Sequence, residues 1–171
     1  MTLVNSFRNI QNAAMTLNAS CAEVFPLLCP VREMDWLPHW QCEMVYSDSG
    51  RAEDNCIFRT EFPGDRGRET WTVSRYEPVR AIEFIRFTPD IKITRLDVHL
   101  YPKGDQTLAI WHRTVTALGD RGRKVVESMD QGEYEEEIRS LEGMLNHYLV
   151  TGRMKSDRVV SSSLKASMDR H

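Results

Sequence analysis

The histidines and cysteines are the residues best suited to chemistry, and their spacing limits what they can do. His39 and Cys42 are separated by two residues and come nearest to a pair of metal ligands. A metal site needs three or four ligands, and no second Cys/His pair accompanies this one. Asp35 and His39 offer a dyad for general base catalysis, but Pro38 breaks the helical register and no nucleophile is spaced to join them. We therefore expect no metal site and no cofactor, and these residues assign no reaction.

Two further histidines, His99 and His112, lie on neighbouring predicted strands. If Lys103-Gly104 is a two-residue hairpin turn, the pairing places His112 opposite Arg95. The two histidines are then four residues apart along the ladder, which is roughly 13 Å at the rise of a strand. We expect them to share neither a metal ion nor a proton.

The pentapeptide Gly-Asp-Arg-Gly-Arg occurs twice, at 64–68 and 119–123. Arginines beside glycine turns suit phosphate or carboxylate groups, so the repeat could form two anion-binding loops. Ordinary turn chemistry with solvated arginines explains it as well, and we prefer that interpretation. No P-loop, dinucleotide fingerprint, nucleophile elbow or HExxH pattern is present in the sequence.

Composition excludes several classes of partner. The 171 residues include 22 Lys+Arg and 25 Asp+Glu, for a net charge of −3 and a pI near 6.0. This balance argues against a nucleic-acid partner and against a polybasic membrane-surface binder. No apolar run approaches the roughly 18 residues of a membrane span, and the chain starts without a secretory signal. We expect a cytoplasmic protein with four reduced cysteines, and its oligomeric state stays open.

The predicted elements begin with a strand and two short helices. Residues 8–18 alternate loosely and predict the strand. Ser20 and Glu23 form a capping box that opens a short helix, and a second helical piece is expected over 31–36. From 42 to 118, short β-rich runs separated by turn residues are typical of an antiparallel meander.

The end of the chain predicts a long helix and a tail. The helix is expected over 123–150, with Thr151-Gly152 as its C-terminal cap. Its apolar stripe, at steps of three and four, is Tyr134, Ile138, Leu141, Leu145 and Tyr148. The order of elements predicts an α+β fold in a single domain over residues 1–152. Residues 153–171 are polar and are expected to be flexible.

Hairpin registers assign strand residues to the face that the long helix covers. The Lys103-Gly104 turn points Trp111 inward and His112 outward. A three-residue connection at 89–91 joins the preceding hairpin to this one, and this length keeps the inner faces of the two hairpins on the same side of the sheet. The expected inner surface is then Phe58, Trp71, Val73, Ile82, Phe84, Leu96, Val98 and Trp111, together with Arg86 and Arg113.

The two inward arginines have two interpretations. A buried charge must be paired or hydrated, so one or both of Arg86 and Arg113 lie at the sheet edge, or the face assignment is wrong by one residue. Alternatively, they provide a cationic spot for the polar end of a ligand in a largely apolar cavity. We favour the first interpretation on the residues alone.

Two segments resemble a known superfamily. The run 20–40, SCAEVFPLLCPVREMDWLPHW, resembles the helical opening of the START/Bet v 1-like (SRPBCC) superfamily, and 145–152, LNHYLVTG, is similar to its closing helix. Within this superfamily the chain resembles the polyketide cyclase/dehydrase-like branch, and the resemblance covers about residues 8–152. It implies a helix-grip fold: a curved antiparallel sheet wrapped around a long C-terminal helix, with two short helices after the first strand.

The resemblance implies binding of lipids, polyketides or other hydrophobic small molecules between sheet and helix. The candidate ligand-binding residues are Trp36, Trp40, Phe58, Trp71, Phe84, Arg86, Trp111, Arg113, Tyr134, Ile138 and Leu141. One alternative is a polyketide-cyclase-like enzyme that uses Arg86, Arg113 or Tyr134 for polarisation or proton transfer. The other is a protein-interaction module with a collapsed cavity, because aromatic residues at these positions are also typical of plain core.

Overall fold

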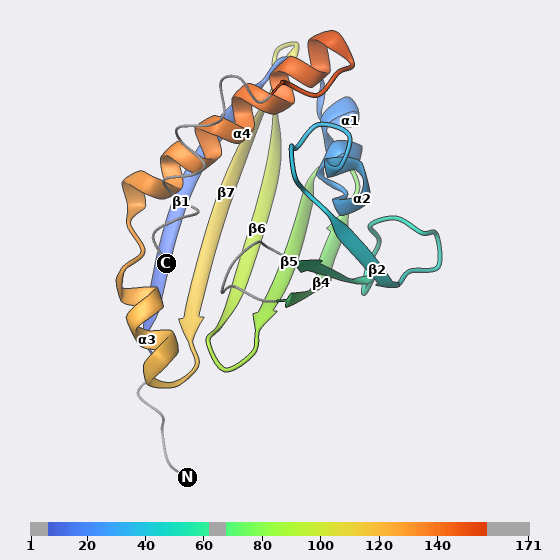
Figure 1. The fold of residues 1–171 in the computed structure, drawn as a ribbon. Helices are drawn as coiled ribbons and strands as arrows, with labels where there is room; N and C mark the ends of the chain where they lie inside the picture. Colours follow the sequence, from blue (N-terminus) through green and yellow to red (C-terminus); the bar gives the residue numbers. More distant parts are fainter. Residues whose placement is uncertain (1–6, 62–67, 157–171) are drawn as a thin grey trace.

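One curved antiparallel sheet carries the fold (Figure 1). The computed structural model describes residues 7–61 and 68–156. Within them the strand order is β1-β7-β6-β5-β4-β3-β2. The strands are β1 (Arg8–Leu17), β2 (Cys42–Tyr46), β3 (Ile57–Glu61), β4 (Arg68–Glu77), β5 (Ala81–Thr88), β6 (Lys92–Lys103) and β7 (Gln106–Ala117).

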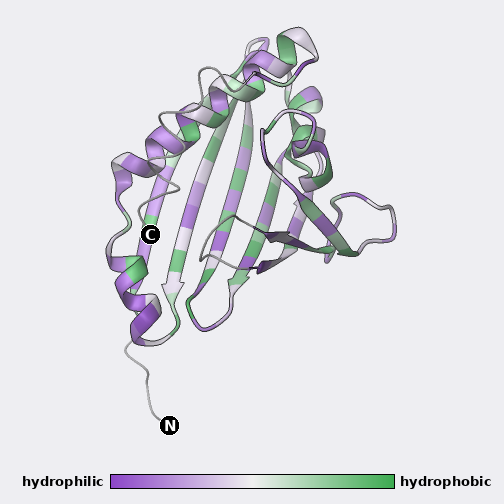
Figure 2. Ribbon diagram, viewed as in Figure 1, coloured by the Kyte–Doolittle hydropathy of each residue, from purple (hydrophilic) through white to green (hydrophobic). Residues whose placement is uncertain are grey.

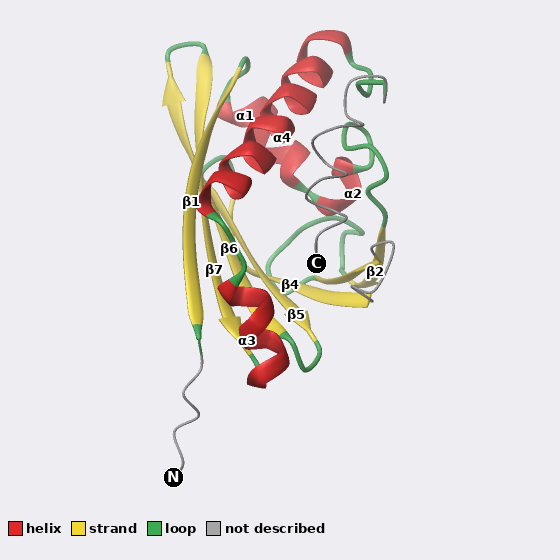
Figure 3. Ribbon diagram, turned by 60° about the vertical axis from the view of Figure 1, so that its left-hand side comes forward, coloured by secondary structure: helices red, strands yellow, loops and turns green. Residues whose placement is uncertain are grey.

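The helices lie on the concave side of the sheet and at its ends. They are α1 (Cys21–Val24), the 3-10 helix η1 (Phe25–Leu28), α2 (Pro30–Glu33), α3 (Gly119–Glu127) and α4 (Gln131–Thr151). Figure 3 shows α1, α2 and α4 on the side toward which the sheet bends. The α+β helix-grip architecture expected from the sequence is therefore confirmed, with two short helices after the first strand and a long C-terminal helix.

The helix ends follow their local sequence. Glu23 accepts hydrogen bonds from the main-chain N–H and the hydroxyl of Ser20, at 3.0 and 2.6 Å, so the predicted capping box forms. Pro30 occupies the first position of α2, where its missing N–H removes no helical bond. Gly152 ends α4 with a left-handed φ of 64°, as expected of a glycine cap.

The single helix expected over 123–150 is wrong, because the chain forms α3 and α4 with a break between them. The Asp130 side chain caps the start of α4. Two side chains of β1 bind the carbonyls at the break: the Asn9 amide donates to Met129 O at 3.2 Å and the Gln11 amide to Asp130 O at 2.6 Å. The break is thus held by contacts from the far end of the chain.

Polar side chains of α4 bind the free edge of β1. The Gln131 side chain accepts from Asn12 N and donates to Asn12 O. Glu142 accepts from Thr16 N at 2.7 Å, and Asn146 donates to Thr16 O at 2.9 Å. An edge strand exposes unpaired main-chain groups, so these bonds both position the helix and protect the edge.

The strand registers confirm the predicted connection between β5 and β6, and they confirm the predicted hairpin of β4 and β5 only in part. Phe84 pairs with Leu96 across a three-residue connection, as expected. Trp71 pairs with Arg86, so the two residues share the inner face, as expected. Beyond that point a bulge in β4 shifts the register, so Arg75 pairs with Glu83 and does not share the inner face with Trp71.

The third hairpin turns one residue later than predicted. Lys103 pairs with Gln106, so Gly104-Asp105 forms the turn. Gly104 has a φ of 62°, which suits the first central position of a type II′ turn. The slip moves every partner by two residues and therefore keeps the faces. As predicted, Trp111 is buried, 6% exposed, and His112 is exposed.

The later turn also changes the distance between two histidines on the convex face. Asp97 lies directly opposite His112, so His99 is diagonal to it. The imidazole centroids are 6.5 Å apart, with the rings at 75°. The roughly 13 Å separation expected from the sequence is therefore wrong.

Alternating hydropathy along β5, β6 and β7 places the core on the concave face (Figure 2). Its largest fully buried side chains include Trp36, Tyr134, Phe58, Met15, Leu17, Ile82, Ile138 and Leu145. None of the helices in the described part of the chain combines the length and the apolarity that a membrane crossing needs. Most of the first pentapeptide copy (64–67) and of the predicted tail (157–171) lies outside the described residues, whereas the second copy opens α3.

Candidate functional site

An aromatic cluster forms one wall of the concave face. Trp71 stacks on Phe58 with ring centroids 5.4 Å apart. It also meets Phe84 at 6.1 Å and Trp40 at 6.0 Å, in both cases edge to face. Three of these residues come from β3, β4 and β5, whose registers place them side by side. The structure thus brings together four of the predicted ligand-binding residues.

Arg86 lies against this aromatic cluster and has a buried carboxylate beside it. Its guanidinium carbon is 4.9 Å from the centre of the Trp71 ring. Its Nε is 3.4 Å from Oε2 of Glu69, whose other oxygen accepts from the Thr88 hydroxyl at 2.7 Å. Glu69 was not predicted as a site residue, although it lies two residues before Trp71 on the same strand and hence on the same face. Arg86 is therefore both ion-paired and on the inner face, so the favoured interpretation, a position at the sheet edge or a wrong face assignment, is wrong for this residue.

Arg113 forms a second polar group on the concave face, near α4. Its Nε and Nη2 donate to Gln11 Oε1 at 2.9 and 2.7 Å. Nη1 donates to Glu137 Oε2 at 3.0 Å. The guanidinium also lies over the Tyr134 ring at 3.9 Å. Gln11 and Glu137 were missed by the sequence prediction, because their contact with Arg113 joins both ends of the chain.

Several buried polar atoms on the concave face lack a hydrogen-bond partner. They include the indole Nε1 of Trp111, the hydroxyl of Tyr134 and the hydroxyl of Thr94. Tyr134 is 1% exposed, and this burial raises the pKa of its hydroxyl, while Arg113 opposes the shift. An indole N–H can only donate a hydrogen bond, so Trp111 needs an acceptor that the described residues do not supply.

Of the remaining predicted site residues, some lie in the core and others are only partly buried at the edge of the concave face. Trp36 is 1% exposed and donates to Leu27 O at 2.9 Å, which places it in the core. Trp40 is half-buried and donates to Pro30 O at 2.9 Å. On α4, Ile138 is buried, and Leu141 is partly buried against the same core.

The carboxyl group of Glu33 on α2 is an unexpected feature. Burial raises its pKa to about 8, because the charged form loses hydration. The Cys42 thiol also has a raised pKa, about 11, owing first to burial and then to the Glu33 charge. The two groups therefore lie near each other. No periodicity or motif in the sequence singles out Glu33.

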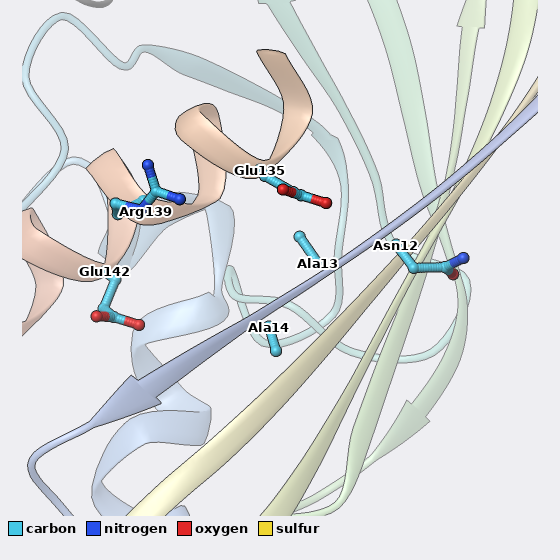
Figure 4. Close-up of a pocket in the computed structure, with 6 residues that line it drawn as sticks. All are labelled: Asn12, Ala13, Ala14, Glu135, Arg139 and Glu142. Carbon is cyan, nitrogen blue, oxygen red and sulfur yellow. The ribbon is translucent and has the colours of Figure 1, made fainter. Parts of the chain in front are cut away.

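Two grooves formed by the described residues lie away from the aromatic cluster. One, of about 360 Å³, lies between β1 and α4 (Figure 4) and is lined by Asn12, Ala13, Ala14, Glu135, Arg139 and Glu142. Ala13 and Glu135 point toward each other across it, whereas Asn12 points away. Another, of about 610 Å³, lies at the end of α4 and is lined by His147, Thr151, Arg153, Met154, Lys155 and Ser156. Neither includes a predicted ligand-binding residue.

Solved structures match the fold over most of the chain. Norcoclaurine synthase from Thalictrum flavum, in complex with dopamine and hydroxybenzaldehyde, has a TM-score of 0.64 at 13% identity, covering 88% of this chain and 91% of that one. CalU16 from Micromonospora echinospora has a TM-score of 0.57 at 12% identity, covering 97% and 96%. DynU16, from the dynemicin biosynthetic locus, has a TM-score of 0.58 at 18% identity.

The shared part of each chain and the lack of sequence matches limit what this likeness shows. The match to DynU16 covers 84% of this chain and 48% of DynU16, so this chain spans about half the length of that protein. No protein-family model matches the sequence, and no curated protein matches it. At such identities the likeness concerns the fold, and it agrees with the strand order and the long C-terminal helix described above. The chain therefore has the same fold as these structures, the helix-grip fold that its resemblance to the START/Bet v 1-like (SRPBCC) superfamily implied.

Proposed function

We propose that the chain binds a hydrophobic small molecule on the concave face, between the sheet and α4. The observation that carries this proposal is the set of buried polar atoms without partners, above all Trp111 Nε1 and the Tyr134 hydroxyl. Leaving a buried polar group unpaired costs about 1–3 kcal/mol. A ligand that supplies the missing hydrogen bonds offsets this cost and gains the burial of its own apolar surface.

The chemistry of the face favours an aromatic or polyketide-like ligand with acceptor oxygens. Phe58, Trp71 and Phe84 pack on one another face to face and edge to face, and an aromatic ring of a ligand can join such a cluster in the same ways. The unpaired Trp111 N–H and the guanidinium of Arg86 are donors, so the ligand's polar atoms are acceptors such as carbonyl or phenolic oxygens. The small aromatic molecules bound in the norcoclaurine synthase structure support this class.

An enzyme of the polyketide cyclase or dehydratase kind is the second candidate, and Glu33 favours it. A carboxyl with a pKa near 8 keeps its proton at neutral pH and can act as a general acid. Conversion of a bound ligand that Glu33→Gln abolishes, with binding retained, separates the enzyme from the binding protein. The remaining alternative, an interaction module, requires that no small molecule binds the concave face.

Mass spectrometry of the purified chain under native conditions tests the proposal. We expect a copurifying small molecule, or one taken up from a panel of aromatic ketones and phenols, at one per chain. Tyr134→Phe removes one unpaired hydroxyl to which the ligand would bind, and it should weaken the affinity for the ligand at least about threefold. Tyr46→Phe, on exposed β2, is the matched control and should change nothing. A chain that binds none of these compounds would exclude the proposal.

A further inference from the structure

The guanidinium of Arg86 has hydrogen-bond donors that no other residue in the described part of the chain uses. Its Nε lies 3.4 Å from Oε2 of Glu69, in an ion pair that forms no hydrogen bond. Its terminal nitrogens, Nη1 and Nη2, form no hydrogen bond with any described residue either. The side chain is 18% exposed, so the guanidinium is not sealed inside the protein. Such an arginine indicates a place for an acceptor that the described residues do not supply.

Glu69 places the opposite charge beside this guanidinium. The residue is only 3% exposed, and its Oε1 accepts a hydrogen bond from the Thr88 hydroxyl at 2.7 Å. The nearest contact between the carboxylate and Arg86 is at Nε, the nitrogen closest to the backbone. A buried carboxylate that is held in this way stays with the arginine and cancels its charge. The terminal nitrogens of Arg86 can therefore donate to a ligand while the ion pair is kept.

Arg86 also lies at the border of the aromatic cluster. It pairs with Trp71 across β4 and β5, and its guanidinium carbon is 4.9 Å from the centre of that ring. Phe84, which meets Trp71 edge to face, is two residues before Arg86 on the same face of β5. An aromatic ligand that joins this cluster therefore brings a polar substituent toward the terminal nitrogens of Arg86.

Resting on the proposed ligand site, we propose that Glu69 makes this site select neutral ligands, namely ketones, esters or amides whose carbonyl oxygen accepts from Arg86. Because Glu69 cancels the charge of Arg86, a carboxylate ligand brings a charge onto the buried face that nothing at this arginine compensates. A carbonyl oxygen accepts a hydrogen bond from Nη1 or Nη2 without that cost. Glu69 acts through Arg86 and need not touch the ligand, so it is a residue that determines specificity.

The second arginine of the concave face has its own counter-charge. Arg113 donates to Oε2 of Glu137 at 3.0 Å, so its charge is also balanced within the protein. Burial raises the pKa of the Tyr134 hydroxyl, and the nearby charges of Arg113 and Arg86 oppose this rise without cancelling it. The hydroxyl is therefore neutral at neutral pH. Neither Arg113 nor Tyr134 adds a net charge that would favour an anionic ligand.

Two probes of nearly the same shape test this selectivity: 2-acetonaphthone, a neutral ketone, and 2-naphthoate, a carboxylate. Both are titrated into the chain at neutral pH, and binding is followed by the indole N–H signal of Trp71, over which Arg86 lies. We expect the wild type to bind the ketone at least about tenfold more tightly than the carboxylate. Equal affinity for the two probes would overturn this inference and leave the proposed function standing. Binding of neither probe would overturn both.

Glu69→Gln tests the role of the carboxylate. Glutamine keeps the size of the side chain and can still bond to Thr88, but it leaves the charge of Arg86 without its counter-charge. The ratio of the two affinities should therefore shift toward 2-naphthoate at least about tenfold. Glu83→Gln is the matched control, because Glu83 is also buried, 7% exposed, and is ion-paired with Arg95 on the convex face. This control should leave the ratio unchanged.

The double variant Glu69→Gln/Arg86→Gln shows whether Glu69 acts through Arg86. With both charges removed, the shift toward 2-naphthoate should disappear, and the ketone should again bind more tightly. An equal shift in the single and the double variant would overturn the inference. A purely structural role of Glu69 would weaken both probes alike in Glu69→Gln, and an unchanged ratio there would overturn the inference too. The wild-type comparison decides the matter even where Glu69→Gln fails to fold.

Discussion

The guanidinium carbon of Arg113 lies 3.9 Å from the centre of the Tyr134 ring, and this contact joins β7 to α4. The same guanidinium binds Gln11 on β1 and Glu137 on α4. Three elements from both ends of the chain thus meet at one side chain. The concave face beside it therefore depends on Arg113 for its shape.

Arg113→Ala should lower the free energy of unfolding by about 2–4 kcal/mol, because it leaves the side-chain oxygen of Gln11, a residue that is 1% exposed, without its donor. Chemical denaturation measures this difference. Arg139→Ala removes an exposed ion pair with Glu136 on the same helix and should change stability by less than about 0.5 kcal/mol. Equal effects of the two substitutions would contradict the assigned role of Arg113.

Two neighbouring residues of β7 should differ strongly in how much stability their truncation to alanine costs. Trp111→Ala opens the core and should cost about 3–5 kcal/mol, or weaken ligand binding. His112→Ala touches only the convex face and should stay within about 0.5 kcal/mol. Thermal and denaturant unfolding of both variants checks the face assignment, which a larger loss for His112→Ala would refute.

Two helical glycines should differ in their tolerance of a methyl group. A Cβ at Gly122 would lie 1.8 Å from Ile91 O, so Gly122→Ala must displace α3 and should cost at least about 2 kcal/mol. At Gly143 the nearest atom is Lys155 Nζ at 3.8 Å. Gly143→Ala should therefore stabilise α4 by about 0.5–1 kcal/mol, in line with helix propensity. Unfolding curves that rank the two variants the other way would disprove this packing of α3.

Stability should fall as the pH rises, through Glu33. Its pKa is raised from 4.5 to about 8 in the folded chain, so the folded state holds a proton that the unfolded state releases. The contribution is complete below pH 4.5 and is lost as the pH rises to about 8. Glu33→Gln should flatten this slope and raise stability at pH 8 by about 1–3 kcal/mol. Glu43→Gln, an exposed carboxylate on β2, should keep the slope. Wild-type stability that is constant from pH 5 to 8 would contradict burial of the Glu33 carboxyl.

Local sequence patterns predicted the start of the first helix and several features of the sheet. The capping box at Ser20 and the three-residue connection before β6 follow from short-range sequence rules, and both are confirmed. The turn at Gly104 could also have been predicted, because a type II′ turn favours glycine at its first central position. The error there left the faces intact, since a slip of two residues preserves the alternation.

Features that depend on contacts between residues far apart in the chain could not be predicted from the sequence. The break before α4 depends on Asn9 and Gln11, which contact it from the other end of the chain. The partners of Arg113 and the approach of His99 to His112 likewise require the final register. The unpaired hydroxyl of Tyr134 is a property of the packed core, and the apolar stripe of the helix gives no sign of it.

The indole N–H signals of the four tryptophans test ligand binding on the concave face most directly. Trp36, Trp40 and Trp71 donate to Leu27 O, Pro30 O and Thr60 Oγ1, whereas Trp111 has no acceptor. The proton–nitrogen spectrum of the chain is followed while the anionic naphthalene dye 1-anilinonaphthalene-8-sulfonate is added. We expect the largest saturable shifts at Trp111 and Trp71, and little change at the core residue Trp36. Indole signals that stay fixed while the dye binds would contradict a ligand site on this face.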